Sequence, residues 1–291
     1  MTESKQREIL MQRIDALLKI NYQDLEERYA QSDDQSDGDG LPWDWCNNFY
    51  MPFGIEMLDS VLGGIKNRHL TLLVGEADSG TTSLALNVIA NAAMQAQSGR
   101  SSGSIALFSA QHHETELSMR LLSITSGVSM ALMRKGMLDA DHWRALADAV
   151  TALRAHDIRI LHEQNLKMDQ VVAASRGEDH DLIVLDRFDL MTSSESEYLR
   201  ETALVEACKS LRKLANDRSV PLLLTATVPL QEGGRSAELL HHWSTDIYDH
   251  VDTIIAFSRR DDGVSLRIIK HDIWPGSPIT VDFDCACMRF S

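Results

Sequence analysis

The sequence predicts an α/β fold in which a mostly parallel sheet is flanked by helices. Three observations support this prediction: short apolar runs recur along the chain, helical patterns separate most of them, and the C-terminal tail alternates between apolar and polar residues. Nearly continuous apolar runs suit strands that are buried on both faces of a sheet. The expected strands are residues 69–74, 104–109, 158–161, 181–186, 220–227 and 251–258.

Between these runs, apolar residues recur at three- and four-residue steps, which indicates amphipathic helices. The clearest helical stretches are residues 81–97, 115–128 and 139–156. The tail from residue 263 to 291 alternates and contains a turn signal at Pro275-Gly276. An antiparallel hairpin at one edge of the sheet is expected there.

Two further segments are predicted ahead of the globular part. Residues 1–31 hold an amphipathic helix, over 5–30, and residues 32–41 are polar and acidic, as is typical of a flexible linker. The globular domain is therefore expected to span residues 42–291. The apolar face of the helix is a candidate partner-binding surface, formed by Leu10, Ile14, Leu17 and Leu25.

Composition limits the classes of function. The 291 residues include 28 Lys and Arg against 43 Asp and Glu, a formal charge of -15. A field of that sign repels polyanions and weakens the case for a large DNA footprint. No apolar run is long enough to cross a bilayer, and the charged N-terminus lacks the apolar core of a secretory signal. The four cysteines show no C-x-x-C pair, so the chain is expected to be cytoplasmic, with reduced thiols.

Residues 75–83, "GEADSGTTS", join an expected strand to an expected helix and nearly match the phosphate-binding pattern G-x-x-x-x-G-K-[ST]. Gly75, Gly80 and Thr82 fit this pattern, but Thr81 stands where the pattern has lysine. Such a loop directs backbone N–H groups at phosphates, its lysine bridges the outer phosphates, and the Ser or Thr holds Mg²⁺.

The lysine is absent, and Glu76 and Asp78 add negative charge within the loop, so we expect a pocket that lacks cations and is lined with carboxylates. Tight ATP binding is therefore not expected. Taken alone, two glycines at this spacing also fit an ordinary strand-to-helix turn.

Several segments together resemble the C-terminal RecA-like motor domain of DnaB-type replicative helicases. They occur in the family's order from about residue 50 to the end: "FGIEMLDSVLGGI", "MRLLSITSGVSMALMRKGMLDADHWRALADAV", "DLIVLDRFDLM" and "SLRKLANDRSVPLLLTATVPL". The resemblance implies a RecA-like fold. We expect the chain to lack the family's large N-terminal helical domain, with the 5–30 helix where the family has a linker helix that docks on a neighbouring subunit.

The resemblance also assigns roles at the ends of the strands. Gln111 stands where the family has a glutamate that polarises the attacking water, and a neutral amide cannot accept that proton. Asp186 is the Walker B carboxylate, which could hold Mg²⁺ together with Thr82 or form an ion pair with Arg187. Thr227, Val228 and Pro229 replace the polar sensor that follows the next strand.

In the family, a Lys and an Arg near the C-terminal hairpin reach the neighbouring subunit's nucleotide. Lys270 is kept here, but Asp272 stands where the arginine finger would be. Loss of such a finger costs on the order of 10³ or more in rate.

These substitutions together predict a pseudo-ATPase that acts through protein–protein contacts, with itself, in a ring or another homo-oligomer, or with a replicative helicase. Thr81, Gln111 and Asp272 are then degenerate catalytic positions, and no cofactor is expected. If ATP and Mg²⁺ still bind, Thr82 and Asp186 would hold the metal. The residues that would hold the nucleotide are Gly75, Ser79, Gly80, Thr81, Thr82, Asp186 and Lys270.

Two alternatives remain open. The first is an ATP-dependent DNA helicase of this family with weak or non-standard ATP use in DNA replication, with Lys66 or a neighbour's Lys270 substituting for the missing lysine. The second is a self-assembling structural module without nucleotide. The segments that correspond to the family's DNA-binding loops, 187–200 and 229–243, mix both charges, so DNA binding is doubtful. Their charged residues are Arg187, Arg200 and Arg235 against Asp189, Glu195, Glu197, Glu232 and Glu238.

Overall fold

The computed structural model describes residues 50–96, 104–163, 166–176, 179–191, 197–228, 245–260, 263–271 and 278–290. The chain divides into two compact units, Met1–Trp45 and Cys46–Ser291, and every described residue belongs to the second unit. The helix predicted for residues 5–30, with its four candidate partner-binding residues, and the acidic linker lie outside the described residues. Both stay predictions.

An eight-stranded sheet with the order β10-β9-β8-β3-β7-β6-β4-β5 lies at the centre of the second unit. The parallel strands are β3 (Leu70–Gly75), β4 (Ser104–Ser109), β5 (Asp157–His162), β6 (His180–Asp186), β7 (Leu222–Thr227) and β8 (Thr253–Arg260). β9 (Gly263–Lys270) and β10 (Ile279–Val281) continue the sheet as antiparallel strands. The predicted mostly parallel sheet with an antiparallel C-terminal edge is confirmed.

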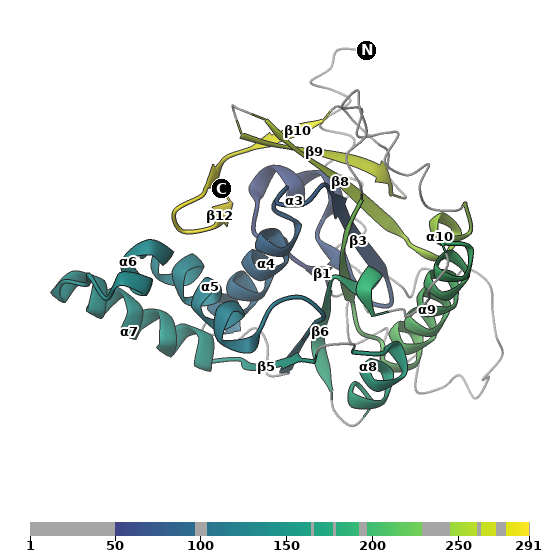
Figure 1. Cartoon of the computed structure of the whole chain (residues 1–291), viewed down its shortest axis with the longest axis horizontal. Helices are drawn as coiled ribbons and strands as arrows, with labels where there is room; N and C mark the ends of the chain where they lie inside the picture. The colour runs from purple at the N-terminus through teal and green to yellow at the C-terminus, as the bar shows by residue number, and fades with distance from the viewer. Residues whose placement is uncertain are drawn as a thin grey trace, which may run out of the picture. The chain divides into compact units, whose positions relative to one another are not determined.

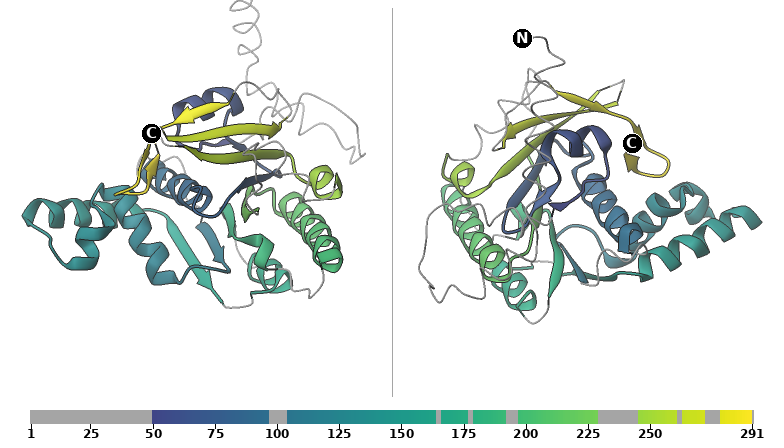
Figure 2. Two further views of the ribbon diagram at one scale, coloured as in Figure 1. Left: turned by 45° about the horizontal axis from the view of Figure 1, so that its top comes forward. Right: turned by 180° about the vertical axis from the view of Figure 1, so that it is seen from behind.

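Helices cover both faces of this sheet (Figures 1 and 2). On one face lie α3 (Glu56–Leu62), α4 (Thr81–Ala96) and α5 (Glu114–Ser126). On the other lie α8 (Met168–Ala174), α9 (Glu197–Arg218) and α10 (Thr245–His250). Because side chains alternate along a strand, β3 supplies Leu73 to the first core and Leu72 to the second. This explains why its sequence is apolar at almost every position.

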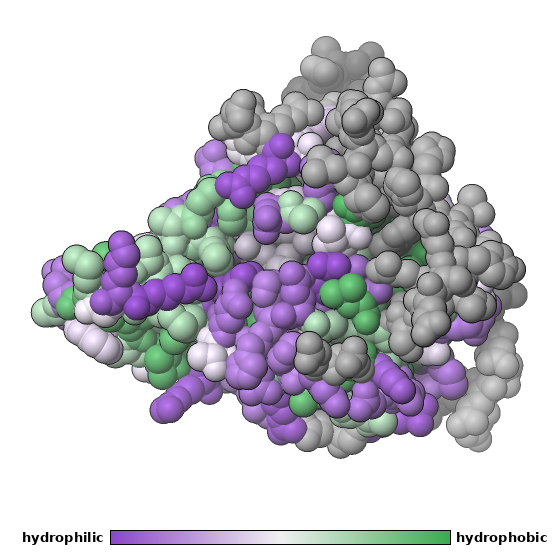
Figure 3. Space-filling model, viewed as in Figure 1, coloured by the Kyte–Doolittle hydropathy of each residue, from purple (hydrophilic) through white to green (hydrophobic). Residues whose placement is uncertain are grey.

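Two helices project beyond the edge of the sheet from the α5 side (Figure 1). They are α6 (Met130–Lys135) and α7 (Ala140–Arg154). The Asp139 side chain accepts a hydrogen bond from the His142 backbone N–H over 2.9 Å and so caps the start of α7. Hydrophobic and hydrophilic side chains are interspersed over this projection (Figure 3), where Met137 and Trp143 are 64% and 62% exposed.

The structure corrects one strand prediction and adds elements that the sequence patterns did not reveal. Residues 158–161 were expected to be buried on both faces, but β5 is the outermost parallel strand, and Leu161 is 40% exposed. The unforeseen elements are the pairs β1 (Tyr50–Met51) with β2 (Ile65–Lys66) and β11 (Phe283–Asp284) with β12 (Arg289–Phe290), and the 3-10 turn η2 (Phe188–Leu190).

None of the described helices is both long enough and apolar enough to cross a membrane.

Candidate functional site

The "GEADSGTTS" loop leaves the C-terminal end of β3 and leads directly into α4. A Cβ atom added to Gly75 would lie 2.4 Å from Oγ of Ser79, so the loop folds back on itself too closely for a side chain there. Gly80 has a φ of +107°, which L-residues rarely adopt, and its Cα faces Phe290 of the C-terminal hairpin. The glycines are therefore required by the shape of the loop.

Ser79 lies inside this loop. Its side chain is buried, and its hydroxyl has no hydrogen-bond partner among the described residues. A buried polar atom without a partner is uncommon in folded proteins.

Asp186, at the end of β6, is 1% exposed and accepts hydrogen bonds from three hydroxyl groups. Oγ1 of Thr82 and Oγ1 of Thr225 donate to its Oδ1 over 2.7 and 2.9 Å, and Oγ of Ser109 donates to Oδ2 over 2.9 Å. The structure thus brings Thr82 and Asp186 together, as the resemblance implied. A hydroxyl in the first turn of α4 beside a carboxylate at the end of β6 suits the hard-oxygen preference of Mg²⁺.

Two roles were expected for Asp186, holding Mg²⁺ or forming an ion pair with Arg187. Arg187 does not form that ion pair. Its backbone is left-handed, with a φ of 61°, and its guanidinium points to Asp189 instead. Nε and Nη2 donate to the two carboxylate oxygens of Asp189, each over 2.9 Å. Nη1 donates to Oε1 of Gln111 over 2.7 Å. The three hydroxyl donors already occupy Asp186, which explains why Arg187 pairs elsewhere.

A second arginine approaches the loop from α5. Nη2 of Arg120 donates to Oε1 of Glu116 over 2.5 Å, and its buried Nε has no partner among the described residues. His112 lies 3.6 Å from the same carboxylate. Burial, followed by the charge of Arg120, lowers the pKa of His112. Burial alone would raise the pKa of Glu116, but the hydrogen bond and charge of Arg120 outweigh it and lower that pKa.

A third arginine comes from β8. Nη1 of Arg259 donates to the backbone oxygen of Asp78 over 3.3 Å, and Nη2 donates to Sγ of Cys285 over 3.2 Å. Arg259 therefore links the loop to the C-terminal hairpin.

These parts enclose a cleft of about 430 Å³. Glu76 and Asp78 line it, as expected, but so do the arginines 120, 187 and 259. The expectation of a site with carboxylates and without cations is therefore wrong. No local pattern indicates this, since Arg120 lies on α5, Arg187 follows β6 and Arg259 lies on β8, and only the tertiary fold brings them together.

The other predicted site residues fall into three groups. Gly80, Thr81, Thr82, Gln111 and Thr227 line the cleft. Lys270 does not, because its Nζ donates to the backbone oxygen of Tyr248 over 2.5 Å and lies 4.6 Å from the centre of that ring. Asp272 lies outside the described residues.

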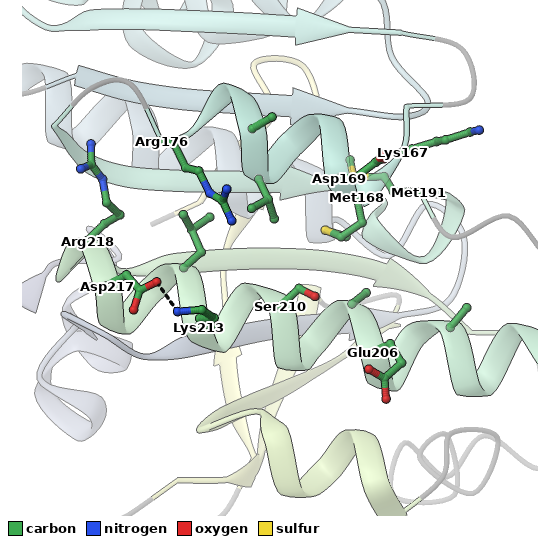
Figure 4. A pocket seen from close by; sticks show the side chains of 15 residues that line it. Lys167, Met168, Asp169, Arg176, Met191, Glu206, Ser210, Lys213, Asp217 and Arg218 are labelled. Carbon is green, nitrogen blue, oxygen red and sulfur yellow. Dashed lines mark hydrogen bonds and ion pairs between the residues drawn. The ribbon is translucent and has the colours of Figure 1, made fainter.

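A larger cavity of about 920 Å³ lies between α8 and α9 (Figure 4). Charged side chains of both signs surround it, and two of them, Lys213 and Asp217, form an ion pair of 2.8 Å. It contains neither the loop nor the Thr82–Asp186 pair. The cleft at the loop is therefore the better candidate site.

Comparison with known proteins agrees with this geometry. The family model described as "DnaB-like helicase C terminal domain" matches residues 51–236, which is more than half of the chain. The chain belongs to this family. The match begins at Met51, the second residue of β1, and includes the loop, Gln111 and Asp186.

Relatives of this DnaB-family chain include three replicative DNA helicases called DnaB. The one from Nostoc sp. is 26% identical over 228 residues, covering 76% of this chain and 23% of the relative. The one from Treponema pallidum is 23% identical, covering 81% and 55%, and the one from Geobacillus stearothermophilus is 26% identical, covering 73% and 47%. The chain therefore spans between about a quarter and about half the length of these curated relatives.

Two solved structures share the fold. The "ATPase Domain of G40P" has a TM-score of 0.71 at 18% identity and covers 95% of this chain and 96% of its own. A DnaB-like replicative helicase, described with its interactions with primase, has a TM-score of 0.70 at 17% identity and covers 99% and 76%. The RecA-like fold that the resemblance implied is confirmed.

Proposed function

We propose that this DnaB-family domain does not turn over ATP and acts through protein–protein contacts, with itself or with a replicative helicase. The observation that carries the proposal is the pair of neutral side chains, Thr81 and Gln111, that line the cleft. They stand at the two positions where the resembled motor has its phosphate-binding lysine and its water-polarising glutamate.

Thr81 supports the proposal by its position and its chemistry. It is the first residue of α4 and is 6% exposed, so its short side chain is held at the helix start. A hydroxyl can form a neutral hydrogen bond to a phosphate but cannot neutralise it. Hydrogen bonds to charged groups contribute about 1.5–3 kcal/mol, compared with about 1 kcal/mol for neutral pairs.

Gln111 supports it through its hydrogen bond. Its amide oxygen accepts from Nη1 of Arg187, and an amide has no atom basic enough to take a proton from water. Its NH₂ group can still orient a water molecule. Orientation without proton transfer leaves the hydrolysis step without a base.

The site residues do fit Mg²⁺, which would be held by Asp186 and the Thr82 hydroxyl and would neutralise phosphate charge when bound. This pair, with the three arginines of the cleft, favours the alternative of an ATP-dependent DNA helicase with weak or non-standard ATP use. Both functions allow a nucleotide to bind, so ATP turnover is the property that distinguishes them.

Protein contact is supported by exposed apolar side chains and by the family. Met137 and Trp143 are more than half exposed on the projecting segment that contains α6 and α7. The relatives are replicative helicases, and one structural neighbour is described with its interactions with primase. A replicative helicase of the DnaB family is therefore the partner we propose to test first.

ATP turnover by the purified chain tests the first half of the proposal. We expect no phosphate release above that of the Asp186→Asn variant, with or without single-stranded DNA. Asp186→Asn is the reference because it removes a metal-binding carboxylate but keeps the shape of the side chain. A rate that exceeds this reference and rises with single-stranded DNA would support the helicase instead.

Mixing the chain with a purified DnaB-family helicase and separating the complexes by size tests the second half. We expect co-elution at micromolar concentrations, weakened by Trp143→Ser and unaffected by Arg154→Ser, an exposed residue later on α7. Elution of the chain in assemblies of its own, without the helicase, would instead favour the self-assembling module.

A further inference from the structure

Two of the four cysteines share one turn. Cys285 and Cys287 flank Ala286 in the turn that joins β11 to β12 in the C-terminal hairpin. Oδ1 of Asp284 accepts hydrogen bonds from the backbone N–H groups of Ala286 and Cys287 over 2.8 and 3.3 Å and so fixes the turn. Cys285 is exposed and Cys287 is buried, and both are thiols in this structure.

We propose that this pair is a thiol modification site. Cys285, beside the guanidinium of Arg259, reacts with a small-molecule disulfide such as oxidised glutathione, and Cys287 then closes a Cys285–Cys287 disulfide. The proposal does not rest on the proposed function, because it requires neither a bound nucleotide nor a partner protein.

The spacing of the two cysteines permits such a bond. The Cα atoms of residues i and i+2 lie at most about 7 Å apart in an extended chain and closer together in a turn. Disulfide-bonded cysteines have Cα atoms about 4.4–6.8 Å apart. Because only one residue separates the two cysteines, the bond can form within the turn, without movement of distant elements.

The surroundings of Cys285 suit it for the first attack. Its exposed thiol is accessible to a small molecule, and Nη2 of Arg259 donates a hydrogen bond to its Sγ over 3.2 Å. The thiolate is the form of cysteine that attacks a disulfide, and the guanidinium provides a counter-charge for it. Cys285 is therefore expected to react before Cys287.

Cys287 is placed to complete the bond rather than to begin it. Burial, together with the negative charge of Asp284, raises the pKa of its thiol. Its Sγ donates a hydrogen bond to the backbone oxygen of Gly127 over 3.0 Å. The thiol is thus shielded from molecules in solution, but it is only two residues along the chain from Cys285.

The reaction consists of two exchange steps. The Cys285 thiolate attacks one sulfur of the small disulfide, which forms a mixed disulfide and releases one small thiolate. Cys287 then gives up its proton, its sulfur attacks the Cys285 sulfur, and the second half of the small disulfide leaves as a thiolate. In total, two protein thiols are oxidised to one disulfide, one small disulfide is reduced to two thiols, and the leaving thiolates take up the two protons.

Oxidation would change how the turn is held. In the reduced chain, the thiol of Cys287 contacts Gly127, which caps the end of α5, and the thiol of Cys285 contacts Arg259 on β8. A disulfide has no S–H group to donate to Gly127, and closing so short a loop gains little stability from the unfolded chain. We therefore expect the oxidised chain to have a Tm lower by about 2–4 °C, as for the loss of one hydrogen bond.

Mass spectrometry of the full chain treated with oxidised glutathione tests the proposal. Trypsin releases residues 271–289 as one peptide, which contains Cys285 and Cys287 and no other cysteine. When the treated chain is unfolded and alkylated, we expect this peptide to lack two hydrogen atoms and to carry no alkyl group. Cys208 is the internal reference, because burial raises the pKa of its thiol to about 12 and should keep it reduced until the chain unfolds. A peptide that stays reduced and fully alkylated overturns the proposal.

Single substitutions separate the two steps. Cys287→Ser should stop the reaction at the mixed disulfide, so that glutathione accumulates on Cys285. Cys285→Ser should leave Cys287 reduced, because the attacking thiol is gone. Two results would overturn the proposal: a glutathione adduct that persists on Cys285 in the unaltered chain, or an adduct that forms on Cys287 just as fast in Cys285→Ser.

Arg259→Gln tests the role of the guanidinium. We expect the first step to slow about 3- to 10-fold, because the thiolate loses its counter-charge. The matched control is Arg144→Gln on α7, whose side chain is 73% exposed and which should react as the unaltered chain does. Circular dichroism establishes that each variant is folded. Equal rates in Arg259→Gln and the control would overturn the role of Arg259.

Thermal unfolding measures the consequence of the bond. The oxidised chain should regain the Tm of the reduced chain when dithiothreitol is added, and glutathione treatment of Cys285→Ser should leave its Tm unchanged. A Tm that rises on oxidation would contradict the expected loss of contacts in the turn. Each of these results is independent of ATP turnover, so the proposed function stands or fails separately.

Discussion

Nη1 of Arg187 donates a hydrogen bond of 2.7 Å to Oε1 of Gln111, while the rest of the same guanidinium binds both carboxylate oxygens of Asp189. Two segments that are 76 residues apart are thus joined across the cleft. The side-chain amide of Gln111 is thus held by its oxygen.

This contact predicts that a carboxylate placed at position 111 by itself does not produce ATP hydrolysis. In Gln111→Glu the new carboxylate would form an ion pair with Arg187, which disfavours accepting a proton. We expect ATP turnover to stay at the Asp186→Asn level and the free energy of unfolding to rise by at most about 1 kcal/mol, as for exposed ion pairs. Phosphate release and urea unfolding measure the two effects. Turnover gained by this single substitution would contradict the prediction.

Asp186 is predicted to be important for stability as well as for metal binding. Asp186→Ala would leave three hydroxyls, of Thr82, Ser109 and Thr225, without their acceptor. We expect a loss of about 2–4 kcal/mol in the free energy of unfolding, because unsatisfied buried polar groups are costly. Thr82→Val removes one donor and should cost about 1 kcal/mol. Urea unfolding measures these losses, with the exposed Asp148→Ala as the control. If Asp186→Ala lowered the free energy of unfolding no more than the control does, the three hydrogen bonds to Asp186 would not stabilise the fold.

The contact between the loop and the C-terminal hairpin can be tested at Gly80. An alanine there must adopt a φ of +107°, and its Cβ would lie 3.1 Å from Cζ of Phe290. We expect Gly80→Ala to destabilise the fold by about 1–3 kcal/mol. Gly127→Ala is the control, because Gly127 also has a positive φ, of +72°, but open space around its Cα. Equal costs would mean that Phe290 does not restrict the loop.

His112 predicts part of the pH dependence of stability. Because burial and Arg120 lower its folded-state pKa below the unfolded value of 6.5, the unfolded chain takes up this proton first as the pH falls. The contribution of His112 to the free energy of unfolding is therefore complete above its unfolded-state pKa and decreases as the pH falls below about 6.5. His112→Gln should show a smaller loss of stability between about pH 7.5 and about pH 5.5 in urea titrations. Parallel losses in both proteins would exclude His112 as the source.

Much of the fold could be predicted because its signals are local. A strand buried on both faces, such as β3, must be apolar at nearly every position, and a helix such as α4 must repeat its apolar residues every three to four positions. The glycines of the loop are likewise fixed by backbone geometry at their own positions. Edge strands such as β5 were misjudged as buried because an apolar run does not say how many neighbours a strand has.

The pairing of Arg187 could not be read from the sequence, because adjacency to Asp186 suggested an ion pair that its left-handed backbone and the three hydroxyl donors prevent. Arg120 and Arg259 gave no signal at all, since no pattern connects positions on α5 and β8 with the loop.

The α/β class, the order of the elements and the neutral residues Thr81 and Gln111 follow from the amino-acid sequence alone, since periodicity, turn chemistry and residue identity are properties of short segments. The charges that surround the "GEADSGTTS" loop follow from the three-dimensional fold and not from any local pattern. Strand order brings Arg259 within 3.3 Å of Asp78 although 181 positions separate them, and electrostatic interaction depends on that distance in space.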